Sequence, residues 1–202
     1  MINSLLYTTP TRVHSGLGST VELNEHIATL GGHRVVLVGD AGLKRIGVLS
    51  TIETLLGDAL VAVTLADIDP TIAAAEQSAN HARHADADLV VGIGGGSALS
   101  LAKAVALLLT NPSPVNDYKG IDRAPSRPAP FIAIPTTAGS GSEVSNAFVL
   151  YDTASDTNIG VRGWGYEPDI AILDAEYLVG LPETPMRDAA ADALSHGFEA
   201  LW

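Results

Sequence analysis

The stretch VVGIGGGSALSLAK (residues 90–103) places four glycines within five residues, between an apolar run and a sequence of helix-forming residues. Residues 88–94 are typical of a buried strand, and residues 97–109 predict a helix. Side-chain-free residues at such a turn let a ligand approach the backbone closely. The N–H groups and positive dipole end at the start of a helix favour an anion, typically a phosphate. The candidates to hold a pyrophosphate are therefore Gly94, Gly95, Gly96 and Ser97.

The alternative interpretation of this turn is a tight strand-to-helix connection that binds no ligand. The spacing of its glycines is not the G-x-G-x-x-G fingerprint, so the usual Rossmann motif argument does not apply to it.

Strand-like and helix-like segments alternate on both sides of this turn. Strands are predicted at residues 33–40, 60–67, 88–94 and 130–136, and helices at residues 43–56, 70–87 and 97–109. Continuous apolar strands separated by helices of this length favour βαβ units, and a parallel sheet covered on both faces. The predicted fold class is therefore α/β, with a Rossmann-like parallel-sheet nucleotide-binding domain.

The pattern changes outside these units. Residues 111–130, with five prolines, predict a surface connection. Residues 147–152, 158–163 and 169–174 predict shorter strands, and a helix begins near Thr184.

A second glycine- and hydroxyl-rich turn, residues 132–146, follows the next predicted strand along the chain. Two such loops at the carboxyl ends of neighbouring strands form the kind of crevice that open α/β sheets use for ligands. The alternative is a hydroxyl-rich turn that caps itself. The hydroxyls that the turn offers to a cofactor are those of Thr136, Thr137, Ser140 and Ser142.

Asp40 ends the first predicted strand, where an acidic residue can accept hydrogen bonds from a ribose diol. Apart from Arg45, a helical turn away, no arginine near Asp40 compensates its charge. A carboxylate at this position would repel a 2′-phosphate, so NAD is favoured over NADP. An Asx-turn or helix-cap role for Asp40 is equally compatible with the sequence.

Composition excludes several classes of protein. The 202 residues are 47% hydrophobic and 17% charged, which indicates a globular chain rather than a disordered one. A net charge of −12 argues against nucleic-acid and anionic-membrane surfaces. The absence of cysteine excludes disulfides and thiolate chemistry. No signal-peptide or membrane-spanning pattern is present, so a soluble, cytoplasmic protein is expected.

The last predicted helix carries an apolar stripe that continues to the end of the sequence at Trp202. Thr184 suits an N-cap and Pro185 the first helical position. We therefore expect an α/β domain over residues 1–180 and, over residues 181–202, the beginning of a second domain in a fragment of a longer protein. The stripe consists of Ala190, Leu194, Phe198 and Leu201.

The same helix places Asp192 and His196 four residues apart, so that both side chains can reach one divalent ion. An exposed Asp–His pair without metal is the alternative. The other histidines are less suitable as ligands: His81 and His84 predict a solvated helix face, whereas the early segments that contain His14, His26 and His33 carry no partner motif.

The motifs PTRVHSGLGS, VGDAGL, GGGSALSLAK, IAIPTTAGSGSEV, PDIAILD and DALSHGFEA occur in the order expected of the iron-containing, metal-dependent alcohol dehydrogenases, which the sequence resembles from about residue 10 to residue 202. The resemblance implies an NAD(P)-binding α/β domain, an all-helical second domain and one metal ion, Fe or Zn, between them. It also implies that Asp192 and His196 are the first two metal ligands, that two histidines follow beyond residue 202, and that the full-length protein is a homodimer.

The activity implied by the resemblance is hydride transfer between a nicotinamide and an alcohol or aldehyde held at the metal. Maleylacetate reductases and phosphonate- or hydroxybutyrate-type reductases share the scaffold, and a nucleotide-binding module without catalysis is the alternative from another class. Two positions depart from the family pattern: Ser100 replaces the usual Asp, and Asn158 replaces the usual Lys near the cofactor.

Overall fold

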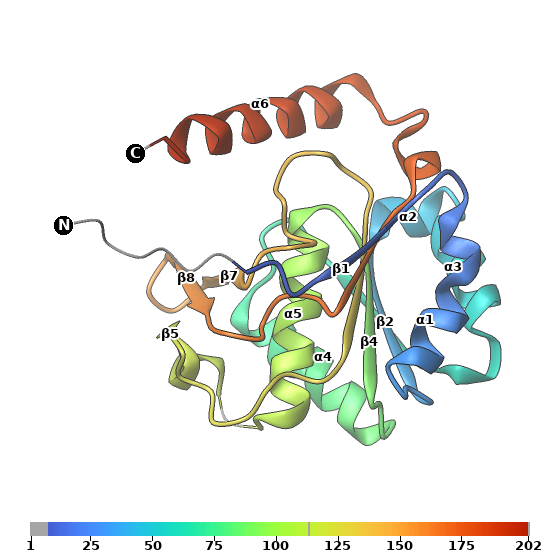
Figure 1. Cartoon of the computed structure of the whole chain (residues 1–202). Helices are drawn as coiled ribbons and strands as arrows, with labels where there is room; N and C mark the ends of the chain where they lie inside the picture. The colour runs from blue at the N-terminus through green and yellow to red at the C-terminus, as the bar shows by residue number, and fades with distance from the viewer. Residues whose placement is uncertain (1–7, 113, 202) are drawn as a thin grey trace.

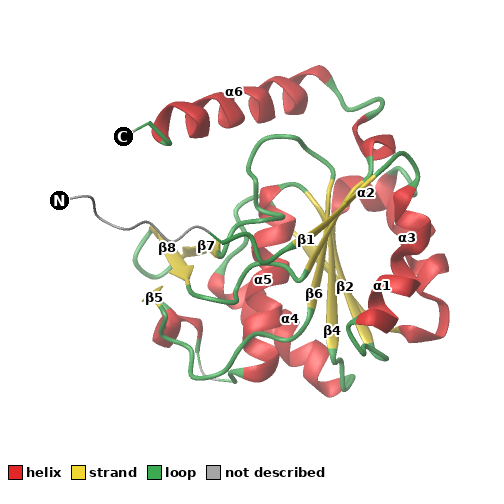
Figure 2. Ribbon diagram, in the orientation of Figure 1, coloured by secondary structure: helices red, strands yellow, loops and turns green. Residues whose placement is uncertain are grey.

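The protein is described by a computed structural model that covers residues 8–112 and 114–201. Within these residues, six parallel strands form the main sheet in the order β1-β9-β6-β4-β2-β3 (Figure 2). This arrangement confirms the predicted parallel α/β fold. The strands are β1 (Arg12–Ser15), β2 (Val35–Asp40), β3 (Leu60–Ala66), β4 (Leu89–Gly94), β6 (Phe131–Pro135) and β9 (Ile170–Leu173).

Helices cover both faces of this sheet, as Figure 1 shows. The α-helices are α1 (Leu23–Thr29), α2 (Ala41–Arg45), α3 (Val48–Leu56), α4 (Ile72–His84), α5 (Gly96–Thr110) and α6 (Glu183–Glu199). Short 3₁₀ turns are η1 (Ser19–Glu22), η2 (Gly57–Ala59), η3 (Val115–Tyr118) and η4 (Ala175–Leu178).

Side chains along each central strand alternate between two hydrophobic clusters. Val36 and Val38 pack with α4 and α5, whereas Val35 and Leu37 pack with α1 and α3. Both faces of the strand are therefore buried, which explains why its sequence is apolar without alternation.

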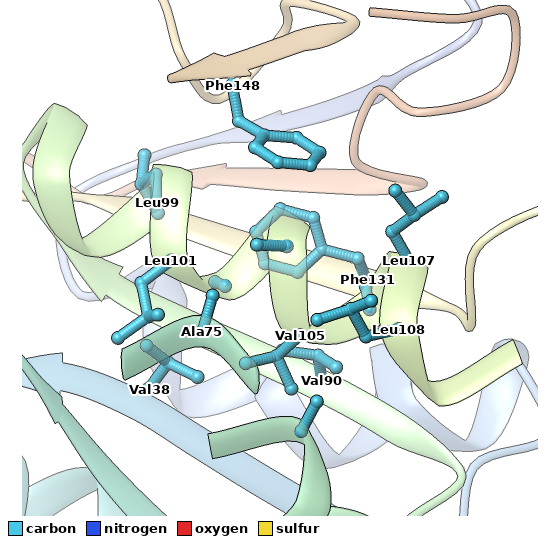
Figure 3. Close-up of a cluster of buried hydrophobic side chains, with 14 of the residues drawn as sticks. Val38, Ala75, Val90, Leu99, Leu101, Val105, Leu107, Leu108, Phe131 and Phe148 are labelled. Carbon is cyan, nitrogen blue, oxygen red and sulfur yellow. The ribbon is translucent and has the colours of Figure 1, made fainter. Parts of the chain in front are cut away.

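Helix α5 is apolar on nearly every side because a second sheet covers its outer face. This sheet consists of β5 (Gly120–Ile121), β7 (Ala147–Asp152) and β8 (Thr157–Arg162). In Figure 3, Phe148 of β7 and Phe131 of β6 lie among the leucines of α5. Burying each of these side chains contributes about 2 kcal/mol, so the packing fixes α5 firmly between the two sheets.

Several predicted boundaries differ from the structure. The predicted helix over residues 43–56 is two helices, because Gly47 between them has a left-handed φ of 83°. Of the three late strands, β9 joins the main sheet and only β7 and β8 lie in the small one. The strands β1 and β5 were not predicted, since four residues or fewer carry too little pattern.

The predicted start of the last helix was wrong by two residues. Pro182 occupies the N-cap position of α6, so Thr184 and Pro185 are the second and third helical residues. Pro185 is tolerated there because the first-turn N–H groups of a helix have no intrahelical partner.

Helix α6 lies across the carboxyl edge of the main sheet, away from both cores (Figure 1). Its predicted apolar stripe is exposed: Leu194 is 62% and Phe198 61% accessible. Trp202, at the end of the stripe, lies outside the described residues. Every helix within residues 8–112 and 114–201 is too short or too polar to cross a bilayer.

Candidate functional site

The loops after β2, β4 and β6 meet at one edge of the sheet, because these strands are parallel neighbours. From β2 the chain continues through α2 and α3 to β3, and from β4 it continues through α5 to β6, which lies on the other side. The strand order therefore reverses between β2 and β4, the position at which open α/β sheets bind ligands.

The glycine turn is built for close approach. Gly94 has a φ of 148°, which side-chain-bearing residues rarely adopt, and a Cβ there would lie 2.6 Å from the Cβ of Ala98. Gly95 is the N-cap of α5 and, having no side chain, leaves the first N–H groups of the helix without a side-chain cap. The first N–H groups of a helix have no intrahelical partner, so this end of α5 offers donors to an anion.

The hydroxyl-rich loop lies against this turn. A Cβ added at Gly95 would be 3.3 Å from Thr137 Oγ1, and one at Gly96 would be 3.2 Å from the Cβ of Ser140. The Thr136 N–H donates to the Gly94 carbonyl at 3.0 Å. Threonine and serine hydroxyls therefore flank the glycines at distances that suit a shared ligand, although Thr136 itself is buried.

Asp40 reaches the same turn from the other side. Its Oδ1 accepts from the Leu43 N–H at 2.8 Å and caps α2. A Cβ at Gly94 would lie 3.2 Å from its Oδ2. The two sequence interpretations of Asp40 are thus compatible, because one carboxylate oxygen caps the helix while the other lies at the glycine turn.

Comparison with known proteins identifies the family of this chain. A family model for iron-containing alcohol dehydrogenases matches residues 10–175. The chain belongs to this family. It is 36% identical over 197 residues to a sulfoacetaldehyde reductase of Bilophila wadsworthia, covering 96% of this chain and 51% of the relative. It is 31% identical to an NAD-dependent methanol dehydrogenase of Bacillus methanolicus, covering 92% and 49%.

Among solved structures, the chain superimposes on a sulfoacetaldehyde reductase from Bifidobacterium kashiwanohense in complex with NAD+, with a TM-score of 0.91 and 27% identity. The match covers 98% of this chain and 54% of that chain. The chain spans about half the length of the curated relatives it matches. The iron-containing alcohol dehydrogenases use NAD(H) and a divalent metal ion.

The two residues predicted as metal ligands in this family member lie together on α6. Asp192 Oδ1 and His196 Nε2 are 3.7 Å apart, and both side chains are about half exposed. Helix α6 touches the hydroxyl-rich loop, because a Cβ at Gly139 would meet the carbonyl oxygen of Ala189 at 2.5 Å. Any side chain at position 139 would therefore force the loop and the helix that carries the predicted ligands apart.

Lys103 was not singled out by the sequence, yet it anchors the same loop. Its side chain is 2% exposed. Its ammonium donates to the carbonyl oxygens of Ser145 at 2.7 Å and Ala147 at 2.9 Å, and to Ser145 Oγ at 2.9 Å. It also donates to Ser142 Oγ at 3.3 Å, so this predicted cofactor residue lies against Lys103. The one signal for this role in the sequence was that Lys103 is the single charged residue of its helix.

The environment of Lys103 predicts a pH-dependent stability. Burial lowers the pKa of Lys103 to about 7, opposed by the charges of Glu143 and Glu167. In the unfolded chain the amine stays protonated up to about pH 10.4. Between these values the unfolded state binds more protons, so the free energy of unfolding rises with pH.

We expect Lys103→Met to remove this rise between about pH 7 and about pH 9, which urea unfolding at several pH values measures. Lys44→Met, at an exposed position on α2, is the matched control and should keep the rise. An unchanged pH dependence in Lys103→Met would contradict the prediction.

The two departures from the family pattern lie in different places. Ser100 is half-buried on α5, one turn after the glycines. Asn158 is exposed on β8, where it pairs with Tyr151 of β7.

His14 and His26, whose segments carry no partner motif in the sequence, are brought together by the fold. His14 Nδ1 and His26 Nε2 are 2.9 Å apart, and their rings meet edge to face. His81 and His84 are exposed, as predicted, and His33 is exposed too. The contact joins β1 to α1, and β1 was not predicted from the sequence.

Proposed function

We propose that this chain is the cofactor-binding half of an NAD(H)-dependent, metal-dependent alcohol dehydrogenase or aldehyde reductase. The observation that carries the proposal is the convergence of three strand ends on one turn. Asp40 lies on one side of the glycine turn, and Thr137 and Ser140 lie on the other. Relatives with alcohol dehydrogenase and aldehyde reductase names, one of them with NAD+ bound, support the same assignment.

The residues at the turn suit a dinucleotide. Side chains at positions 95 and 96 would fill the space beside Thr137 and Ser140. Because both positions are glycine, the backbone is available to a pyrophosphate. The N-terminus of α5 supplies N–H donors and the positive dipole end. In this assignment Ser97, Thr137 and Ser140 supply further hydroxyls, whereas Thr136 and Ser142 are buried, with Ser142 accepting from Lys103.

Asp40 should select NAD over NADP. Its free Oδ2 would accept from a ribose 2′-OH and repel a 2′-phosphate. Asp40→Gly should lower the ratio of the NADPH to the NADH dissociation constant by about tenfold, since one removed like-charge contact is worth about 1.4 kcal/mol. Calorimetric titration with both cofactors measures the ratio.

Asp40→Asn separates charge from helix capping, because the amide oxygen can still accept from the Leu43 N–H. This variant should show the same shift toward NADPH as Asp40→Gly. A native protein that already prefers NADPH would contradict the assignment of Asp40.

The metal end would be completed by residues beyond this chain. Asp192 and His196 provide an oxygen and a nitrogen donor on one helix face, a set that suits Fe²⁺ or Zn²⁺. In this proposal residues 1–180 form the nucleotide-binding domain, and residues 181–202 open a helical domain. A divalent ion held there would polarise the substrate oxygen, while the nicotinamide would exchange the hydride.

The proposed substrate is a small alcohol or aldehyde. Relatives named for sulfoacetaldehyde, methanol and 4-hydroxybutyrate show how wide the choice is within one scaffold. We further propose a homodimer at full length and a cytoplasmic location, which the lack of cysteine fits.

A non-catalytic nucleotide-binding module is the second candidate, and the observation that favours it is the small number of metal donors on α6. Asp192 and His196 are two, whereas catalytic sites usually use at least three protein ligands.

The deciding experiment extends the chain to the length of its relatives and follows NADH oxidation with short aldehydes, with and without added Fe²⁺ or Zn²⁺. Metal-dependent turnover supports the enzyme. NADH binding without turnover under all these conditions would leave the binding module. Failure of the extended chain to bind NADH, with or without added metal, would contradict both candidate functions.

A further inference from the structure

A cluster of two histidines and one glutamate lies outside the proposed cofactor and metal sites. His14 comes from β1, Glu22 from η1 and His26 from α1. One ligand atom from each side chain lies within 4.8 Å of the other two. The cluster shares no residue with the Asp192–His196 pair, and each of its side chains is partly accessible from solvent.

We propose that His14, Glu22 and His26 bind a divalent transition-metal ion of the Zn²⁺ class. Imidazole nitrogen and carboxylate oxygen are the donors that such ions prefer, and two histidines with one glutamate is a recurrent zinc-ligand set. The set provides three protein ligands, which leaves one position of a tetrahedral ion to water.

The observed spacing is close to what a tetrahedral ion requires. Bonds of about 2.0–2.1 Å at tetrahedral angles place neighbouring donor atoms about 3.3 Å apart. His14 Nδ1 and His26 Nε2 are 2.9 Å apart, and His14 Nδ1 and Glu22 Oε2 are 3.6 Å apart. These distances lie on either side of the required value, so small side-chain rotations would admit the ion.

The backbone around the cluster is held in place independently of any ion. Asp174 at the end of β9 accepts from the Gly18 N–H at 2.9 Å and from the Thr20 N–H at 3.1 Å, which fixes the turn before Glu22. Leu23 and Ile27 of α1 are buried in the core beneath His26. A metal would therefore meet ligands whose main chain is already ordered.

The contact between the two imidazole rings also suits a metal. One ring must donate the shared proton to the other in the absence of an ion, and the ion would replace that proton.

A metal at this position would connect the edge strand β1 to α1. Because the ion binds the folded chain, Zn²⁺ should raise the melting temperature, and the stabilisation should grow with the logarithm of the ratio of its concentration to its dissociation constant. Affinity should fall as the pH is lowered through the imidazole range, since protons compete for the same nitrogens.

The test uses the 202-residue chain with Asp192→Ala and His196→Ala, which removes the α6 pair as a source of binding. Zn²⁺ titration calorimetry should give one site per chain, and Co²⁺ should give the absorption of a tetrahedral complex. His26→Gln and His14→Gln should each weaken Zn²⁺ binding by at least about tenfold and remove the Zn²⁺-dependent rise in melting temperature.

His33→Gln, which removes an exposed histidine near the same end of the chain, is the matched control and should bind as the parent does. Circular dichroism checks that each variant is folded. The proposal is overturned if the parent shows no one-to-one Zn²⁺ binding, or if folded His14→Gln and His26→Gln bind as tightly as His33→Gln. NADH binding is unaffected by either result, so the proposed function is tested separately.

Discussion

Replacing Gly95 with valine is expected to abolish NAD(H) binding while leaving the fold intact. A Cβ at this position meets Thr137 Oγ1 at 3.3 Å, a tight contact that a shift of the Thr137 side chain by a few tenths of an ångström relieves. The backbone at Gly95 is extended, so a branched side chain is compatible with it. The two γ-methyl groups of valine would then occupy the space in which a pyrophosphate meets the α5 N–H groups. We expect affinity for NADH to fall by at least about 100-fold, or about 2.7 kcal/mol.

Gly160→Val is the matched control for this substitution. Gly160 lies on β8 with open space around the position of an added Cβ, and its backbone is that of a strand. The control should keep NADH affinity and melting temperature. Calorimetry for NADH and thermal unfolding for both variants complete the comparison. Unchanged affinity in a folded Gly95→Val protein would show that the turn is structural only.

The central strands of the main sheet, β2, β4 and β6, were predictable because they are buried on both faces. Strands such as β2 and β4 are continuous apolar runs that end at a turn, and helices with clear starting residues separate them. Thr71, for example, caps α4 through its hydroxyl at the position where the helix-forming sequence begins. Local patterns of this kind are set by the chain itself, so the sequence carries them.

Two kinds of feature could not be predicted from the sequence: short elements, and contacts between segments that are far apart in the chain. The four residues of β1 become a strand only because β9 provides a parallel partner across more than 150 residues. The contact between His14 and His26 depends on that pairing, and so it was missed. Lys103 was overlooked for the same reason, because its acceptors are 39 to 44 residues away.

The candidate site was likewise predictable only in part. The residues at the strand ends could be chosen from the sequence, since parallel neighbours bring their carboxyl ends together. Only the structure shows that one carboxylate oxygen of Asp40 caps α2 while the other lies at the glycine turn. The N-cap of α6 was misplaced because a threonine side chain favours that position, whereas the helix begins two residues earlier, after Pro182, with no side-chain cap.

Loss of His196 is expected to remove the catalytic metal and the activity of an extended protein together. Asp192 and His196 face each other on α6, so each can contribute one bond to the same ion. Polarisation of the substrate oxygen by a metal is worth several kcal/mol, so His196→Ala should lower kcat by about a thousandfold or more. Affinity for NADH should be unchanged, because the glycine turn and Asp40 belong to the sheet rather than to α6.

His81→Ala, which removes an exposed histidine from α4, is the control for this variant. Metal content by mass spectrometry should fall by one ion per chain in His196→Ala and remain at the parent value in His81→Ala. The 202-residue chain should bind this ion weakly and release it to a chelator, because two protein donors leave most of the coordination sphere to water. Turnover of an alcohol by the 202-residue chain with added iron or zinc, or an extended His196→Ala protein that retains the full metal content, would show that the α6 pair is not the metal site.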